Sequence, residues 1–98
     1  GEIAKKISPE RLVFLTDVPG IMDNNGRVIP RMNLTIAKNL ISSGVIKGGM
    51  IPKLGACITA LNDVKYADII DGRKPNSLMD CVKDKRIGTR ILGLSSGI

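Results

Sequence analysis

The sequence predicts an α/β fold with a mainly parallel β-sheet. Three short apolar runs, 12–16, 66–70 and 89–92, have the length and composition of strands that are buried in a sheet. Two stretches with apolar residues at helical spacing, 36–41 and 50–61, lie between the first and second of these runs. Strands that alternate with helices in this way are typical of a parallel sheet that helices cover.

The first third of the chain predicts a helix end, a strand and a small β-hairpin. Residues 2–7 resemble the end of an amphipathic helix, and the strand at 12–16 stops at a Pro-Gly turn. In the segment 21–29, Asn25-Gly26 stands between apolar pairs, which is the strongest short signal for a hairpin. We therefore expect a small two-stranded excursion before the first complete helix.

Three helices follow from the spacing of apolar residues and from the residues at their ends. Thr35 is the expected N-cap of the first helix, and Gly44 suits its end. The second helix starts near Met50 and tolerates Pro52 in its first turn. Its core-facing positions are Met50, Leu54, Cys57, Ile58 and Leu61. A short third helix is marked by Leu78, Met79 and Val82.

The chain is long enough for one small domain, 1–98, and not for two, with a flexible tail expected at 93–98. A sheet of only three strands is thin, and an apolar run such as 12–15 needs a cover on both faces. The sequence therefore indicates a fragment whose first half lies elsewhere, or one half of an assembly.

Composition excludes several classes of function. The chain combines a net charge of +6 with 43% hydrophobic residues, which is too apolar for a disordered basic tail. Aromatic residues are 2%, which argues against a nucleic-acid partner. With no His, and with Cys57 and Cys81 far apart, we expect no metal site. No membrane span or signal peptide is expected, which favours the cytoplasm, or an organelle matrix in a eukaryote.

Two acidic turns are expected at the carboxyl edge of the sheet, where parallel sheets bind ligands, and a glycine-rich helix start is a further candidate site. Asp17 follows the first strand and Asp71-Gly72-Arg73 follows the second, so both acidic turns should share this edge. At 48–53, two glycines precede a helix start that carries Lys53, an arrangement that suits a phosphate. The alternatives are a flexible loop with a solvated lysine, a turn-capping Asp17, and an Arg73 paired with Asp71. Lys83, Lys85, Arg86 and Arg90 form a basic cluster that we interpret as a solvated face, the alternative being a surface that attracts phosphate or nucleic acid.

The order and spacing of four motifs resemble the C-terminal half of the N-acetyl-L-glutamate kinases, within the amino-acid kinase family. The motifs are Thr-Asp-Val-Pro-Gly at 16–20, Gly-Gly-Met-Ile-Pro-Lys at 48–53, Asp-Gly-Arg at 71–73 and Gly-Thr-Arg at 88–90. The resemblance runs from about Glu2 to Gly93. It implies a three-layer α/β/α sandwich in which this half binds Mg²⁺-ATP. The implied reaction transfers the ATP γ-phosphoryl group to the side-chain carboxylate of N-acetyl-L-glutamate, in arginine biosynthesis.

The resemblance also implies a role for individual residues. Lys53 matches the catalytic lysine that stabilises the transferring phosphoryl group, and Mg²⁺ arrives with the nucleotide. Two segments would contact ATP, the first near ribose and adenine and the second beside the adenine. The residues of the first segment are Asp17, Val18, Pro19, Gly20, Ile21 and Met22, and those of the second are Val45, Ile46 and Lys47. Gly49 and Met50, at the start of the following helix, would lie at the phosphates.

Parts of the family pattern are absent from these residues. The first-strand lysine, the glycine-rich substrate loop and an Asn-Ala-Asp segment do not occur, so we predict that the isolated chain is inactive. The acetylglutamate pocket would lie mostly in the other half, and we expect the full-length enzyme to be a homo-oligomer. Some members have a PII-type regulator, which this sequence does not decide. The alternatives are an aminoadipate or glutamate kinase, and a nucleotide-binding module without catalysis.

Overall fold

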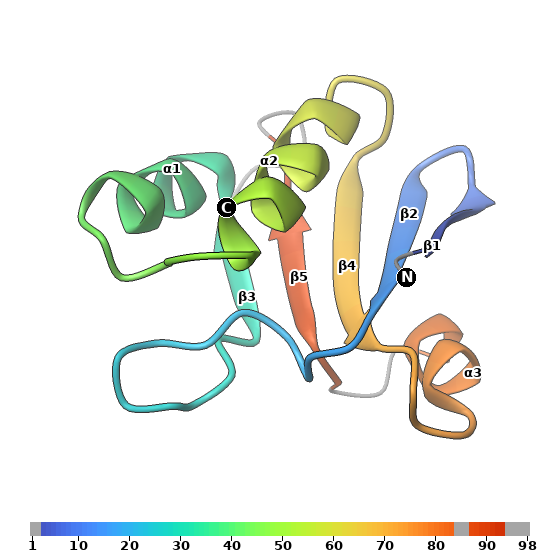
Figure 1. Ribbon diagram of the computed structural model, residues 1–98. Coiled ribbons are helices and arrows are strands. Elements are labelled where there is room, and N and C mark those ends of the chain that lie inside the picture. Colours follow the sequence, from blue (N-terminus) through green and yellow to red (C-terminus); the bar gives the residue numbers. More distant parts are fainter. Residues whose placement is uncertain (1–2, 84–86, 94–98) are drawn as a thin grey trace.

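The computed structural model describes residues 3–83 and 87–93, which form a single mixed β-sheet with three helices (Figure 1). Within these residues the sheet has five strands in the order β1-β2-β4-β5-β3. The strands are β1 (Ile3–Ser8), β2 (Arg11–Thr16), β3 (Arg31–Asn33), β4 (Tyr66–Asp71) and β5 (Thr89–Leu92). The helices are α1 (Leu34–Ser42), α2 (Met50–Ala60) and α3 (Ser77–Val82). The predicted α/β class is confirmed.

The central strands β2 and β4 are parallel, and their register fixes the position of the two acidic turns. Thr16 at the end of β2 lies opposite Asp71 at the end of β4. The pairing of β3 with β5 is also parallel, whereas β1 with β2 and β4 with β5 are antiparallel. Because β2 and β4 run in the same direction, both of their carboxyl ends meet at one edge of the sheet.

Two apolar cores lie on opposite faces of the sheet, because successive side chains of a strand point to opposite sides. Helices α1 and α2 cover one face (Figure 1), with Leu54 and Cys57 of α2 fully buried against Ile69 and Ile91. The other face holds a smaller cluster around Val13, Ile70 and Cys81. The short α3 covers this second face beside β4.

The predicted helices are present, with corrections at two places. The N-cap of α1 is Asn33 and not Thr35: the Asn33 carboxamide oxygen accepts a 2.8 Å hydrogen bond from the Ile36 amide. Asn33 takes this role because β3 ends there in an extended conformation, so Thr35 already lies inside the helix. In α3, Leu78 packs against the core, but Met79 and Val82 are exposed.

Residues 3–8 form strand β1, so the prediction of a helix end at 2–7 is wrong. The chain turns at Pro9 and Glu10 and pairs β1 antiparallel with β2. A four-residue spacing of Ile3 and Ile7 fits one helical turn and also two strand repeats, so the spacing could not distinguish a helix from a strand.

The excursion expected at 21–29 is present, but its ladder is one isolated bridge between Met22 and Val28. Residues 94–98, most of the expected tail, lie outside the described residues, and the Gly93 amide donates to the Lys65 carbonyl.

Candidate functional site

The two acidic turns lie side by side at the carboxyl edge of β2 and β4, as the sequence predicts. The Gly72 amide donates a 2.8 Å hydrogen bond to the carbonyl of Thr16, which joins the two turns through their backbones. Asp17 follows Thr16 directly and is exposed, whereas Asp71 is buried. The edge therefore presents one open carboxylate and one enclosed carboxylate.

Lys53 reaches this edge from the first turn of α2. Its Nζ lies 3.3 Å from Oδ1 of Asp17. The Lys53 side chain is 14% exposed and that of Asp17 is 73% exposed, so the cation is held in place while its partner faces solvent. The hydrogen bond from Lys53 is the main cause that lowers the pKa of Asp17, with a smaller contribution from the charge of Arg73.

The backbone that leads into α2 is open to solvent. Gly48 has a positive φ of 60°, and Gly49 is the N-cap without a side-chain hydrogen bond to the helix start. A Cβ built on either glycine would meet nothing within 4 Å. The amides of Met50 and Ile51 at the start of α2 donate to the carbonyls of Lys47 and Gly48 at 3.4 Å and 3.2 Å, and Pro52 has no amide hydrogen. An approaching anion therefore finds the exposed Gly48-Gly49 loop and the positive end of α2 with Lys53 beside them, which is an arrangement that favours phosphate.

Arg73 is paired with Asp71, as one of our two interpretations of it expects. Its guanidinium donates from Nε to Oδ1 and from Nη2 to Oδ2, both at 2.9 Å, and its amide also donates to Oδ1. These hydrogen bonds lower the pKa of Asp71 to about 2 and raise the pKa of Arg73. Arg73 thus adds positive charge near Asp17 while remaining engaged with Asp71.

The other residues predicted to contact the nucleotide differ in their exposure to solvent. Met22 and Lys47 have exposed side chains, whereas Gly20, Ile21 and Ile46 are buried. The half-buried residues are Val18, Pro19, Val45 and Met50. Ile21 and Ile46 belong to the apolar core, so a ligand would meet their backbone and not their side chains.

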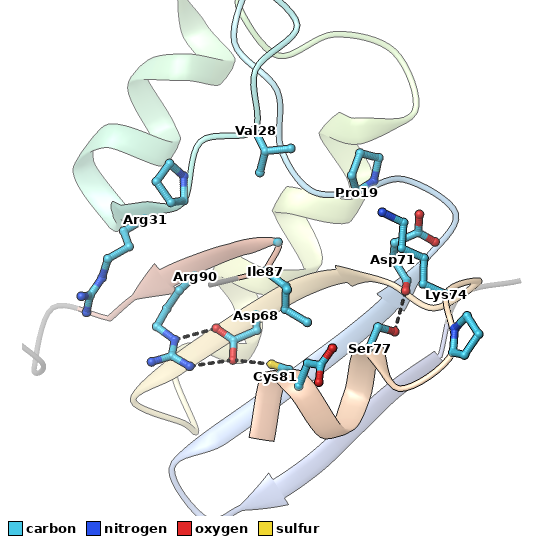
Figure 2. Close-up of a pocket in the computed structure, with 14 residues that line it drawn as sticks. Pro19, Val28, Arg31, Asp68, Asp71, Lys74, Ser77, Cys81, Ile87 and Arg90 are labelled. Atoms are coloured by element: carbon cyan, nitrogen blue, oxygen red, sulfur yellow. Dashed lines mark hydrogen bonds and ion pairs between the residues drawn. The ribbon is translucent and has the colours of Figure 1, made fainter. Parts of the chain in front are cut away.

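A separate cavity of about 770 Å³ lies on the α3 face of the sheet (Figure 2). Of the predicted nucleotide contacts it includes only Pro19, and of the acidic edge it includes Asp71. Its floor carries Asp68, whose buried carboxylate accepts hydrogen bonds from Arg11 and Arg90 at 2.8 to 3.2 Å and from the Cys81 thiol at 3.2 Å. Arg90 therefore belongs to a buried ion cluster, which corrects its assignment to a solvated basic face. Lys85 and Arg86 lie outside the described residues.

The ion cluster was not predicted from the sequence. Asp68 stands inside an apolar strand, and Arg11 is separated from it by 57 positions. The Tyr66 ring packs under both guanidinium groups. The distance from its centroid is 4.6 Å to the guanidinium carbon (Cζ) of Arg90 and 5.6 Å to that of Arg11. A charged residue within the run 66–70 was the one signal that a buried partner of opposite charge was required.

Within residues 3–83 and 87–93, no three His, Cys, Asp or Glu side chains are close enough together to hold a metal ion. Among the same residues, no helix has the length and apolar character needed to span a membrane.

A model described as the amino acid kinase family matches residues 1–71. Three similar curated proteins are named acetylglutamate kinase. They come from Dehalococcoides mccartyi (44% identical over 95% of this chain), Nostoc sp. PCC 7120 (45% over 95%) and Caldanaerobacter subterraneus subsp. tengcongensis (49% over 93%). The chain spans only about a third of their length: 34%, 33% and 32%.

Two solved structures share the fold. The N-acetylglutamate synthase of Neisseria gonorrhoeae, in complex with coenzyme A and L-arginine, superimposes with a TM-score of 0.75 at 25% identity. This match covers 85% of the present chain and 20% of the synthase. A protein of Streptococcus mutans UA159 gives a TM-score of 0.63, also at 25% identity, over 85% of this chain and 29% of its own.

Proposed function

Because this chain belongs to the amino acid kinase family, we propose that it is the ATP-binding part of an acetylglutamate kinase. The names of the curated relatives support this choice within the family. Since the chain spans about a third of their length, the reaction of the whole protein is part of the proposal.

The proposed reaction joins two anions. The bond between the γ-phosphorus of ATP and the bridging oxygen breaks, ADP leaves with that electron pair, and the side-chain carboxylate of N-acetyl-L-glutamate forms the new bond to phosphorus. A protein accelerates such a transfer mainly by positioning the groups and by compensating charge. A fixed cation beside the phosphate site is therefore the feature that this chain has to provide.

The observation that carries the proposal is the contact between Lys53 and Asp17. It brings Lys53, whose side chain is only 14% exposed, to the junction of the 17–22 turn and the start of α2. In the bound state, phosphate oxygens would replace the exposed Asp17 carboxylate as partners of Lys53. The ammonium group would stay where it is and offset the charge of the transferring phosphoryl group.

The described residues fit ATP better than a resident metal. The exposed Gly48-Gly49 loop at the start of α2 suits the phosphates, and the 17–22 turn reaches this helix through the 3.3 Å contact of Asp17 with Lys53. Because no three ligating side chains gather within residues 3–83 and 87–93, Mg²⁺ would be held by the nucleotide phosphates. Bound there, the ion would supply further neutralisation of phosphate charge.

Calorimetric titration of this chain with Mg²⁺-ATP tests the proposal. We compare the wild type with Lys53→Ala and with Lys38→Ala, which removes an exposed lysine of α1 as the matched control. We expect saturable binding that Lys53→Ala weakens about tenfold or more, as the loss of a charge-assisted hydrogen bond predicts, and that Lys38→Ala leaves unchanged. A folded wild-type chain that does not bind ATP, or equal weakening by both variants, would contradict the proposal.

A further inference from the structure

The Thr89 hydroxyl joins both ends of the 21–29 excursion. Thr89 is the first residue of β5 and is fully buried. Its Oγ1 accepts a 2.9 Å hydrogen bond from the Ile21 amide and donates a 2.6 Å hydrogen bond to the Ile29 carbonyl. The Thr89 hydroxyl therefore acts as donor at one end of the loop and as acceptor at the other, although Thr89 lies 60 positions beyond Ile29 in the sequence.

Gly20 lets the loop approach β5 closely enough for these hydrogen bonds, and Gly88 lets the start of β5 lie against β4. A Cβ on Gly20 would stand 2.9 Å from Oγ1 of Thr89 and 2.9 Å from Cγ1 of Val28. A Cβ on Gly88 would stand 2.1 Å from the Ile69 carbonyl oxygen. The loop is therefore closely packed against the start of β5, which is itself closely packed against β4.

The excursion has its own backbone hydrogen bonds, among them those from the Asp23 amide to Arg27 and from the Gly26 amide to Asp23, but they join residues of the loop to one another. It contains one isolated bridge, Met22 with Val28, and a 2.7 Å hydrogen bond from the Ile29 amide to the Ile21 carbonyl. At its tip, the Asp23 side chain accepts from the amides of Asn25 and Arg27. None of these interactions ties the loop to the sheet, whereas those of Thr89 do.

We propose that Thr89 is a positioning residue for the nucleotide site: by holding the Ile21 backbone, it keeps the 17–22 turn where Asp17 meets Lys53. The argument rests on the proposed function, because it takes 17–22 to be a nucleotide-binding segment. Thr89 contacts neither Lys53 nor the open start of α2 in the hydrogen bonds described, so it acts through the loop backbone. A serine at position 89 would keep this positioning role, and a side chain without a hydroxyl would lose it.

The test combines amide hydrogen exchange with ATP binding in Thr89→Val and Thr89→Ser. Valine preserves volume and removes the hydroxyl, whereas serine keeps the hydroxyl. We expect Thr89→Val to speed exchange of the Ile21 amide at least tenfold and to weaken Mg²⁺-ATP binding about tenfold. Thr89→Ser should stay near wild type in both. The Gly93 amide, bonded to Lys65 at the far end of β5, should be unchanged and so excludes a general loss of the strand.

The outcomes of these measurements distinguish the positioning role of Thr89 from the proposed function itself. Unchanged ATP affinity in Thr89→Val, with or without faster Ile21 exchange, would overturn the positioning role and leave the proposed function intact. A folded wild type that binds no ATP would overturn both. If Thr89→Val does not fold, Thr89→Ala removes the hydroxyl without added bulk and is read in the same way. Equal defects in Thr89→Ser and the hydroxyl-free variant would also overturn the role.

Discussion

The Lys53 ammonium lies 3.3 Å from the Asp17 carboxylate, although the two residues are 36 positions apart. The pair is unequal, because Lys53 is mostly covered and Asp17 is mostly exposed. Arg73 stands nearby but donates to Asp71 through two guanidinium nitrogens. The carboxyl edge of β2 and β4 thus has two carboxylates, each with its own principal cation.

This pairing predicts a crossed effect of two substitutions on two pKa values. Lys53→Ala should raise the pKa of Asp17 more than Arg73→Gln does, because Lys53 is its principal cause and Arg73 a minor one. Arg73→Gln should instead raise the pKa of Asp71 from about 2 towards its ordinary value of 3.8. Titration of the carboxyl carbons by NMR measures both. Equal responses of the two carboxylates to either variant would contradict the assignment.

The same pKa values predict the direction of the acid dependence of stability. Both carboxyl pKa values are lower in the folded chain, so folding favours the charged form. The resulting stabilisation is fully present above the ordinary value of 3.8, and is lost as pH falls through that value towards 2. Urea unfolding at several pH values should show a shallower loss over this interval in Arg73→Gln. An unchanged slope would contradict the prediction.

The buried Asp68 predicts a large cost of substitution. Asp68→Asn removes the charge that both Arg11 and Arg90 contact, and leaves two guanidinium groups with a neutral partner in a largely buried cluster. Breaking a buried ion pair on one side costs about 3 kcal/mol or more. Urea denaturation measures the loss, with Asp63→Asn in the exposed turn after α2 as the control. A loss in Asp68→Asn no larger than in the control would contradict this account.

Local patterns predicted the strands β2, β4 and β5, the three helices and the shared acidic edge. These features were predictable because each depends on the spacing of apolar residues, or on a turn residue, within a few positions of the sequence. Strand β3 was missed because three residues with one buried member, Met32, show no period. Strand β1 was missed because its spacing fits a helix equally well.

Long-range partners lie beyond such patterns. The sequence placed Asp17 at the predicted edge and Lys53 in the first turn of a helix, but their contact depends on how α2 packs against the sheet. The hydrogen bonds of Thr89 and Asp68 likewise join positions 13 to 68 residues apart. A hydroxyl or a carboxylate in a strand carries no sign of which distant group it will meet.

The isolated chain is expected to be inactive as a kinase. Lys53 is the single catalytic lysine that the family resemblance finds here, and one cation compensates only part of the charge that two reacting anions bring together. A coupled assay of ADP release with ATP, Mg²⁺ and N-acetyl-L-glutamate measures this. Turnover that Lys53→Ala abolishes would contradict the expectation, and turnover that the variant retains would indicate a contaminating kinase.

Two glycines with similar backbone angles should respond differently to alanine. Gly26 and Gly88 have φ values of 76° and 67°, so alanine is strained at both. At Gly26 the new methyl group meets nothing within 4 Å, and the cost should be about 1 kcal/mol. At Gly88 the methyl group would stand 2.1 Å from the Ile69 carbonyl oxygen, which adds a backbone clash and should raise the cost to about 3 kcal/mol or more. Urea unfolding compares the two, and equal losses would mean that close packing between β5 and β4 does not limit position 88.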